Sequence, residues 1–313
     1  MKLIEKHTLK GHALGITALA YNKKKGVIYS GSLDKSIKTW NLNINNNNDM
    51  GAPELVDSIV AHDKWITDLK YIDNGSLLIS ASLDSTIKFW KTVSKSLKFN
   101  LYFDKHTDYI QKIVYLEKSE KIISSGFESK TFIWDLKNFR LASNIEKYNA
   151  SVISLAHSDD ESNLFMGSSN SEIIIWDLKR QQMRDILNGQ GPISDLKIIK
   201  EQNVLIAIDE YGGFYGWDLG NFDLLFSNQL KEQLYSIEVA YFNRSAYIFI
   251  GGTNKLHIFS FPIKETSELD AHNDKIISLL TIQVHKNINL EPKNYLFSGS
   301  LDKTIKIWEI IKD

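Results

Sequence analysis

The chain has 313 residues, 43% of them hydrophobic and 24% charged, which suits a soluble globular protein with two ordinary domains or one large β-architecture. Its 37 basic and 38 acidic residues leave a formal net charge of −1, so we expect no binding to nucleic acid or to an anionic membrane. The absence of cysteine excludes disulfides, zinc–thiolate sites and a cysteine nucleophile, and it favours a cytoplasmic or nuclear location, or both.

Short segments of alternating apolar and polar residues recur along the chain, and each ends at an aromatic residue. The first is SIKTW at 36–40 and the last is TIKIW at 304–308. This alternation is typical of β-strands. The final aromatic residues recur at intervals of roughly 40–50 residues. They are Trp40, Trp90, Trp134, Trp176, Trp217, Phe259 and Trp308.

A second β-rich run precedes these segments, such as VIYSGS at 27–32 and YLFSGS at 295–300. A turn of Asp, Gly, Ser or Asn separates the two runs. No helical pattern of about 10–15 residues intervenes, which excludes parallel βαβ units. Four short strands in each period of about 40–45 residues predict an all-β protein, a seven-bladed β-propeller with four-stranded antiparallel blades.

Individual residues also match a known family. A histidine stands ahead of several of the tryptophans, in Gly11-His12, Ala61-His62, Lys105-His106 and Ala271-His272. Other strands end in the dipeptide Trp-Asp, at Trp134-Asp135, Trp176-Asp177 and Trp217-Asp218. By these motifs the chain resembles the WD-repeat β-propellers over nearly its whole length, with seven repeats.

The last repeat stops after three strands, at Trp308, and its outer strand is missing. Residues 2–9 precede the first repeat, and we expect them to pair with the last blade and close the ring. A single domain is therefore expected over residues 1–313. Two insertions are expected side by side on the bottom face: a disordered, asparagine-rich loop at 43–53 and a second loop at 285–294.

The resemblance implies a buried, hydrogen-bonded set of His, Ser, Asp and Trp in each intact blade. The sets are His12, Ser30, Asp34 and Trp40 in blade 1, His62, Ser80, Asp84 and Trp90 in blade 2, and His272, Ser298, Asp302 and Trp308 in blade 7. Buried polar groups of these kinds need partners. An Asp-His-Ser trio could also be a hydrolase triad, but its recurrence in three blades favours the structural interpretation.

The other blades depart from this set. Glu128 replaces the aspartate of blade 3, which places its network in question, and Met166 occupies the serine position of blade 4. Blade 5 has Gln190 at the histidine position and Tyr211 near the aspartate position, and blade 6 lacks the set altogether. We therefore expect blades 7, 1 and 2 to be stiffer than blades 4–6.

Propellers of this family usually bind proteins or peptides on their top face, so the resemblance implies a scaffold that acts as a subunit of a complex. Six apolar or aromatic side chains are candidates for that face, because they start an inner strand or precede a turn acid. They are Leu33, Trp65, Leu83, Tyr109, Phe127 and Leu301. An exposed apolar patch usually marks a partner. The alternative is that these side chains pack into the central channel or against neighbouring turns.

No catalytic constellation, metal-ligand spacing or cofactor motif is found, so we expect no enzyme activity, metal, cofactor or small-molecule substrate. No run of about 18 apolar residues could span a bilayer. An enzyme that uses the central channel is disfavoured, because no titratable cluster converges there. Blades 2 and 3 look like those of the WD-repeat cofactor of ubiquitin-specific proteases. An alternative function is therefore an accessory activator of such an enzyme.

Overall fold

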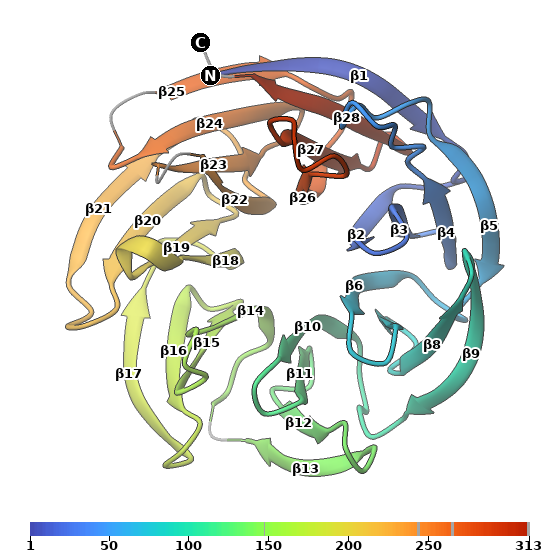
Figure 1. Cartoon of the computed structure of the whole chain (residues 1–313). Coiled ribbons are helices and arrows are strands. Elements are labelled where there is room, and N and C mark those ends of the chain that lie inside the picture. Colours follow the sequence, from blue (N-terminus) through green and yellow to red (C-terminus); the bar gives the residue numbers. More distant parts are fainter. Residues whose placement is uncertain (147, 243–244, 264–265, 312–313) are drawn as a thin grey trace. The chain divides into compact units, whose positions relative to one another are not determined.

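The computed structural model describes residues 1–146, 148–242, 245–263 and 266–311. These residues form seven four-stranded antiparallel sheets and one short 3₁₀-helix, η1 (Lys200–Gln202), which confirms the predicted all-β, seven-bladed propeller fold (Figure 1). Among them, no helix is long and apolar enough to cross a membrane. The sheets fall into two compact groups, the first made of residues 1–104 and 272–313 and the second of residues 105–271.

Three sheets make up the first group. They are blade 1, with strand order β2 (Ile16–Asn22), β3 (Val27–Ser32), β4 (Ser36–Asn41) and β5 (Glu54–Val60); blade 2, with β6 (Ile66–Ile72), β7 (Leu77–Ser82), β8 (Ile87–Val93) and β9 (Ser96–Phe103); and blade 7, with β26 (Ile276–Val284), β27 (Lys293–Ser300), β28 (Thr304–Ile311) and β1 (Lys2–Lys10). All six residues of β3 and of β7 are buried, whereas β5 is largely exposed. Each sheet therefore packs through its inner strands and leaves its last strand toward solvent.

Four sheets make up the second group. They are blade 3, with β10 (Ile110–Leu116), β11 (Lys121–Gly126), β12 (Thr131–Asp135) and β13 (Arg140–Ile145); blade 4, with β14 (Val152–His157), β15 (Asn163–Ser168), β16 (Glu172–Asp177) and β17 (Gln182–Asn188); blade 5, with β18 (Ile193–Ile199), β19 (Val204–Asp209), β20 (Gly213–Asp218) and β21 (Leu224–Gln229); and blade 6, with β22 (Ser236–Phe242), β23 (Ser245–Gly251), β24 (Lys255–Phe261) and β25 (Thr266–Asp270).

The N-terminal strand completes the last blade, as predicted. β1 runs antiparallel to β28, from the pair Lys2 and Ile311 to the pair Lys10 and Thr304, and the two strands lie side by side in Figure 1. Leu9 of β1 is buried in the core, while most other residues of the strand are exposed. β1 therefore covers a strand edge of blade 7 that would otherwise present unpaired backbone groups.

The hydrophobic core of the first group lies between neighbouring sheets. Ile16 and Ile28 of blade 1 pack in one cluster with Phe297 and Ile307 of blade 7, and all four are almost fully buried. Gly299 permits this close approach, because a Cβ atom at that position would lie only 2.7 Å from Cγ2 of Ile16. The glycine of the repeated Gly-Ser pair thus provides space for the first isoleucine of the next blade.

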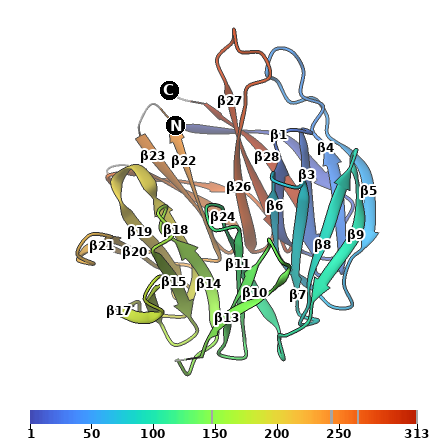
Figure 2. The same cartoon turned by 60° about the horizontal axis from the view of Figure 1, so that its bottom comes forward.

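The two insertions lie beside each other at one end of the first group (Figure 2). Asn48 is fully buried: its side-chain amide donates to the carbonyls of Asn287 and Glu291 at 3.1 and 3.2 Å, and its Oδ1 accepts the N–H of Asn287 at 2.7 Å. Asp49 also forms an ion pair with Lys293. The structure places part of the asparagine-rich segment 43–53 in contact with residues distant in sequence, and its predicted disorder stays a prediction.

Pairing of β1 with β28 can be tested by a disulfide, since the chain has no cysteine of its own. Lys2 and Ile311 are directly opposed and both exposed, and opposed residues of antiparallel strands are about 4.5–5.5 Å apart at Cα. We expect the double variant Lys2→Cys, Ile311→Cys to form an intramolecular disulfide under mild oxidation, detectable by mass spectrometry. Its melting temperature should rise on oxidation, because the bond closes a loop of nearly the whole chain.

The two single-cysteine variants serve as controls and should show no change in melting temperature on oxidation. Failure of the double variant to form the bond in the native state, while the denatured chain forms it under the same oxidation, would contradict the observed pairing.

Candidate functional site

In each of blades 1, 2, 3 and 7 a backbone hydrogen bond joins the residue before the turn acid to the residue that precedes the inner strand. In blade 2 the N–H of Leu83 donates to the carbonyl of Trp65, and in blade 3 the N–H of Phe127 donates to the carbonyl of Tyr109, both at 3.0 Å. The equivalent pairs are Leu33 with Gly15 in blade 1 and Leu301 with Lys275 in blade 7. All six candidates therefore lie at the same end of their own sheets, where the second strand turns into the third; we call this the turn end.

The aromatic candidates are the more exposed ones. Trp65, Tyr109 and Phe127 are 48%, 40% and 45% exposed, whereas Leu33, Leu83 and Leu301 are half-buried. The rings of Tyr109 and Phe127 pack edge to face with their centroids 6.1 Å apart, a favourable aromatic geometry. Within blade 3 these two side chains form one aromatic surface. The larger cluster predicted over blades 2 and 3 stays a prediction.

Leu301 contributes mainly to packing between blades. A Cβ atom at Gly15 would lie 2.5 Å from Cδ2 of Leu301, so this side chain lies directly over the start of β2 in the neighbouring blade. Leu14, which precedes that glycine, is 44% exposed at the same end. Leu14 is not among the six candidates chosen from the sequence. The signal that could have identified it is an apolar residue in a turn, where a polar residue would remain hydrated.

A chain of buried hydrogen bonds lies beneath this surface in blade 2. The indole N–H of Trp90 donates to Oγ of Ser80 at 2.9 Å, and the same Oγ lies 2.7 Å from Nε2 of His62. On the other side of the ring, Nδ1 of His62 lies 2.8 Å from Oδ2 of Asp84. The equivalent side chains make the same contacts, at 2.7–2.9 Å, in blades 1 and 7: His12, Ser30, Asp34 and Trp40, and His272, Ser298, Asp302 and Trp308.

The donors and acceptors of this chain match only when the histidine is neutral. Ser80 accepts the N–H of Trp90 and can donate its own hydroxyl proton to Nε2 of His62, while Nδ1–H donates to Asp84. A protonated His62 would present a second N–H to the Ser80 oxygen and leave the serine hydroxyl without its acceptor. The buried chain is therefore fully satisfied in one protonation state.

The turn carboxylate connects this buried chain to the surface. Asp84 accepts the backbone N–H of Asp63 and that of Thr86, each at 3.0 Å, as well as the Thr86 hydroxyl at 2.6 Å. Asp63 lies just before β6, and Thr86 lies just after the turn that holds Leu83. One carboxylate thus fixes both segments that carry Trp65 and Leu83.

Burial and hydrogen bonding shift the pKa values of this pair. Burial alone would raise the pKa of Asp84, but hydrogen bonds from His62, Thr86 and the Asp63 N–H hold it well below its usual range. Burial lowers the pKa of His62, against the opposing effect of Asp84. Burial likewise lowers the pKa of His272 in blade 7, again against its aspartate, Asp302. These shifts favour an aspartate anion paired with a neutral imidazole.

The Asp-His-Ser trio is not arranged for hydrolysis. Ser30, Ser80 and Ser298 are fully buried, and the oxygen of each one already accepts a tryptophan N–H. A nucleophile needs room for a reacting carbon within about 3–3.5 Å, which these buried hydroxyls do not offer. Among the described residues, no group of three or more His, Asp or Glu side chains could hold a metal ion.

Blade 3 has a complete chain, although its sequence suggested otherwise. Glu128 contacts Nδ1 of His106, and its other oxygen accepts the N–H and hydroxyl of Thr107 at 2.8 and 2.6 Å. His106 Nε2 lies 2.6 Å from Oγ of Ser124, which accepts the Trp134 N–H at 2.8 Å. The extra methylene of glutamate lets its carboxylate reach the same donors.

Blades 5 and 6 use carboxylates at other positions. Asp209 of blade 5 is fully buried and accepts the N–H groups of Gln190, Gly191, Tyr211 and Gly213 and the hydroxyl of Tyr215. Burial, with the bond to Asp209, raises the pKa of Tyr215 to about 12. In blade 6, Glu232 lies 2.6 Å from Nε2 of His257 and accepts the Thr253 N–H at 2.6 Å. Blade 6 therefore has a histidine–carboxylate pair that the sequence pattern did not reveal.

Blade 4 is built differently. Met166, at the serine position, is fully buried in an apolar cluster, and Asn170 contacts the hydroxyl of Ser168. Ser168 also donates to the carbonyl of Glu172 at 2.8 Å and accepts its N–H at 3.2 Å. A serine and an asparagine thus organise this turn without a buried histidine–carboxylate pair.

Comparison with known families agrees with this strand pattern. Four segments match the WD40 family, described as WD domain, G-beta repeat: residues 4–41, 53–91, 141–177 and 263–309, together more than half of the chain. The matches at 4–41, 53–91 and 141–177 each cover the outermost strand of one sheet and the three inner strands of the next. The third match falls on blade 4, so the match does not require the histidine–aspartate pair.

The buried histidines predict a loss of stability on mild acidification. A histidine whose folded-state pKa is lowered contributes stability that is present above its unfolded pKa, about 6.5, and that is lost as the pH falls toward the folded value. We expect the melting temperature to fall between pH 7.5 and 5, through His62 and His272. A further fall below about pH 4 is expected from Asp84, whose folded pKa is also lowered.

The variant His62→Asn, His272→Asn tests the assignment. It should melt lower than the wild type at pH 7.5, because it leaves Ser80, Ser298 and the two carboxylates with altered partners, but its melting temperature should change less between pH 7.5 and 5. An equal change in melting temperature between pH 7.5 and 5 in both proteins would contradict the role of these histidines. The single variant His62→Asn provides the same comparison if the double variant does not fold.

Proposed function

The chain belongs to the WD40 repeat family, whose propellers generally bind other proteins without catalysing a reaction, and from this we propose that it is a non-catalytic scaffold that captures a protein or peptide at the turn end of its blades. The proposal includes a role as a subunit of a complex in the cytoplasm or the nucleus, or both. The lack of cysteine supports such a compartment.

The observation that carries the proposal is the exposure of aromatic side chains on a rigid support. Trp65, Tyr109 and Phe127 are each 40% exposed or more, although their backbone is fixed by the bonds between inner strand and turn. Aromatic residues dominate binding hot spots, because they bury a large area with few rotatable bonds. A rigid support lowers the conformational entropy lost on binding.

Packing against neighbouring turns accounts for the leucines better than for these aromatic residues. Leu33, Leu83 and Leu301 are half-buried, and Leu301 lies over Gly15. We therefore assign the main contacts with a partner to the exposed aromatic side chains, Trp65 in blade 2 and the pair Tyr109 and Phe127 in blade 3, and a smaller contribution to the leucines.

Substitution of the aromatic residues tests the proposal. The variant Trp65→Ala, Phe127→Ala should lose its co-purifying partner, measured by quantitative mass spectrometry after affinity purification, while its melting temperature changes little. Loss of a hot-spot aromatic typically weakens binding by about 2 kcal/mol or more, which is roughly thirtyfold. The matched control Tyr102→Ala, Leu225→Ala removes similarly exposed side chains from the outer strands β9 and β21 and should retain the partner. Equal retention by both variants would contradict the proposal.

A second candidate is an accessory activator of a ubiquitin-specific protease, which the resemblance of blades 2 and 3 favours. The two functions differ in a simple assay: the purified complex should accelerate hydrolysis of a fluorogenic ubiquitin substrate only if the partner is such a protease. Loss of that acceleration in the Trp65→Ala, Phe127→Ala variant would place the activator function on the same surface.

A further inference from the structure

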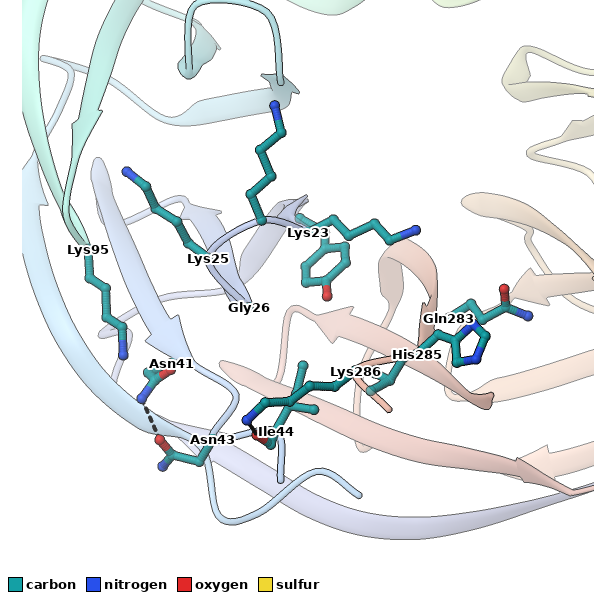
Figure 3. A pocket seen from close by; sticks show the side chains of 13 residues that line it. Lys23, Lys25, Gly26, Asn41, Asn43, Ile44, Lys95, Gln283, His285 and Lys286 are labelled. Carbon is teal, nitrogen blue, oxygen red and sulfur yellow. Dashed lines mark hydrogen bonds between the residues drawn. The ribbon is translucent and has the colours of Figure 1, made fainter. Parts of the chain in front are cut away.

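A pocket opens at the other end of the first group, opposite the turn end; we call this the loop end. It has a volume of 460 Å³ and is lined by the β2–β3 turn, the segment after β4, the β8–β9 turn and the chain that follows β26 (Figure 3). These segments lie far apart in the sequence. Pockets of about 300–1,000 Å³ are the size that small molecules occupy.

The lining of this pocket is strongly basic. It includes five lysines and one histidine and, among its described residues, no aspartate or glutamate. The basic residues are Lys23, Lys24, Lys25, Lys95, His285 and Lys286. The chain as a whole is almost neutral, with a net charge of −1, so this concentration of cations is local. A cleft lined by charges of one sign attracts a ligand of the opposite sign.

Two carboxylates near this end are paired with lysines outside the pocket. Asp49 forms an ion pair with Lys293, and Glu309 lies 3.0 Å from Lys6 and 3.7 Å from Lys293. Within the described part of the chain, no ion pair or hydrogen bond holds the ammonium groups of Lys23, Lys24 or Lys95. These three cations remain available to a ligand.

Two other lysines hold the pocket in shape. Lys25 donates to the carbonyl and hydroxyl oxygens of Thr92 at 2.7 and 3.1 Å, which ties the β2–β3 turn to β8. Lys286 donates to the carbonyl of Ile44 at 2.8 Å, which ties the insertion after β26 to the one after β4. The pocket is therefore built before a ligand arrives, although like charges gathered in one place repel one another.

We propose that this pocket binds a compact ligand that carries two or more phosphate groups. Phosphate oxygens accept strong charge-assisted hydrogen bonds from ammonium groups, and several phosphates would neutralise several lysines at once. Asn41 and Asn43 also line the wall, where the amide of Asn41 donates to Oδ1 of Asn43 and that of Asn43 donates to the carbonyl of Ala52, and Tyr21 adds a hydroxyl. A duplex nucleic acid would need a longer basic stripe than this local pocket offers. The proposal concerns a different ligand and the opposite end from the protein-binding site proposed above.

Inorganic tripolyphosphate is a suitable first probe, measured by isothermal titration calorimetry on the intact protein at two salt concentrations. We expect one site per chain, with affinity that falls as salt rises, because added ions screen the attraction. The variant Lys23→Gln, Lys24→Gln, Lys95→Gln should weaken binding by at least about tenfold. Capture of partners by the turn end should be unchanged in this variant, so failure of either proposal can be recognised separately.

The matched control is Lys10→Gln, Lys91→Gln, Lys98→Gln, which removes the same charge from exposed lysines of the same group that do not line the pocket. It should bind within about twofold of the wild type, since net charge alone acts weakly at this distance. Absence of binding by the wild type, or an equal loss in the two triple variants, would overturn the proposal.

Vesicles that contain about 5% phosphatidylinositol 4,5-bisphosphate distinguish a lipid headgroup from a free ligand. This content is roughly that of a lightly charged membrane. Vesicle binding that tripolyphosphate displaces would support the site with its phosphates presented by a lipid. Binding of tripolyphosphate without vesicle binding would support a free ligand. Vesicle binding that tripolyphosphate and the Lys23→Gln, Lys24→Gln, Lys95→Gln substitutions leave unchanged would overturn the proposal.

Discussion

A carboxylate that joins the start of the inner strand to a turn is the interaction on which most blades depend. Asp34, Asp84, Glu128 and Asp302 each accept a backbone N–H from the residue after the histidine, at 2.8–3.1 Å. Asp209 accepts two such groups in blade 5, and in blade 6 the direction is reversed, because Glu232 precedes the inner strand and accepts the Thr253 N–H. A carboxylate buried beside such donors is costly to remove, because every donor would lose its acceptor.

The same interaction explains how a structural motif can present a binding surface. The carboxylate, the histidine and the serine are satisfied within the blade, and their oxygen and nitrogen atoms are not available to a partner. The side chains of Trp65 and Phe127, beside these fixed turns, take no part in that network. Their exposure supports a function in binding without being needed for the fold.

The fold could be predicted from the sequence because its signals are local and repeated. Aromatic residues at regular intervals, six tryptophans and Phe259, marked the third strand of each sheet, and the incomplete last repeat indicated that β1 would pair with β28. The carboxylates of blades 5 and 6 were missed because they stand at other positions in the repeat. Asp209 and Glu232 nevertheless accept backbone N–H groups as the turn aspartate does. The spacing of residues in the sequence does not identify these two carboxylates. The folded chain shows which backbone N–H groups they accept.

The basic pocket was missed for another reason. Three consecutive lysines at 23–25 are a visible signal, but such a run in a turn is usually a solvated surface. Lys95 and Lys286 join them only because two turns and an insertion meet at one end of the first group. The contacts of Asn48 in the 43–53 segment were unpredictable on the same grounds, since they are made with backbone groups about 240 residues away.

The pairing of β1 with β28 also bears on synthesis of the protein. β1 leaves the ribosome about 300 residues before its partner, and at roughly 5–20 residues per second it waits about 15–60 seconds without a strand to pair with. A free apolar strand would aggregate in that time. β1 carries Lys2, Glu5, Lys6 and Lys10 among its nine residues, and most of its side chains remain exposed after pairing. Charged side chains on an unpaired strand disfavour edge-to-edge association, which suits β1 to this delay.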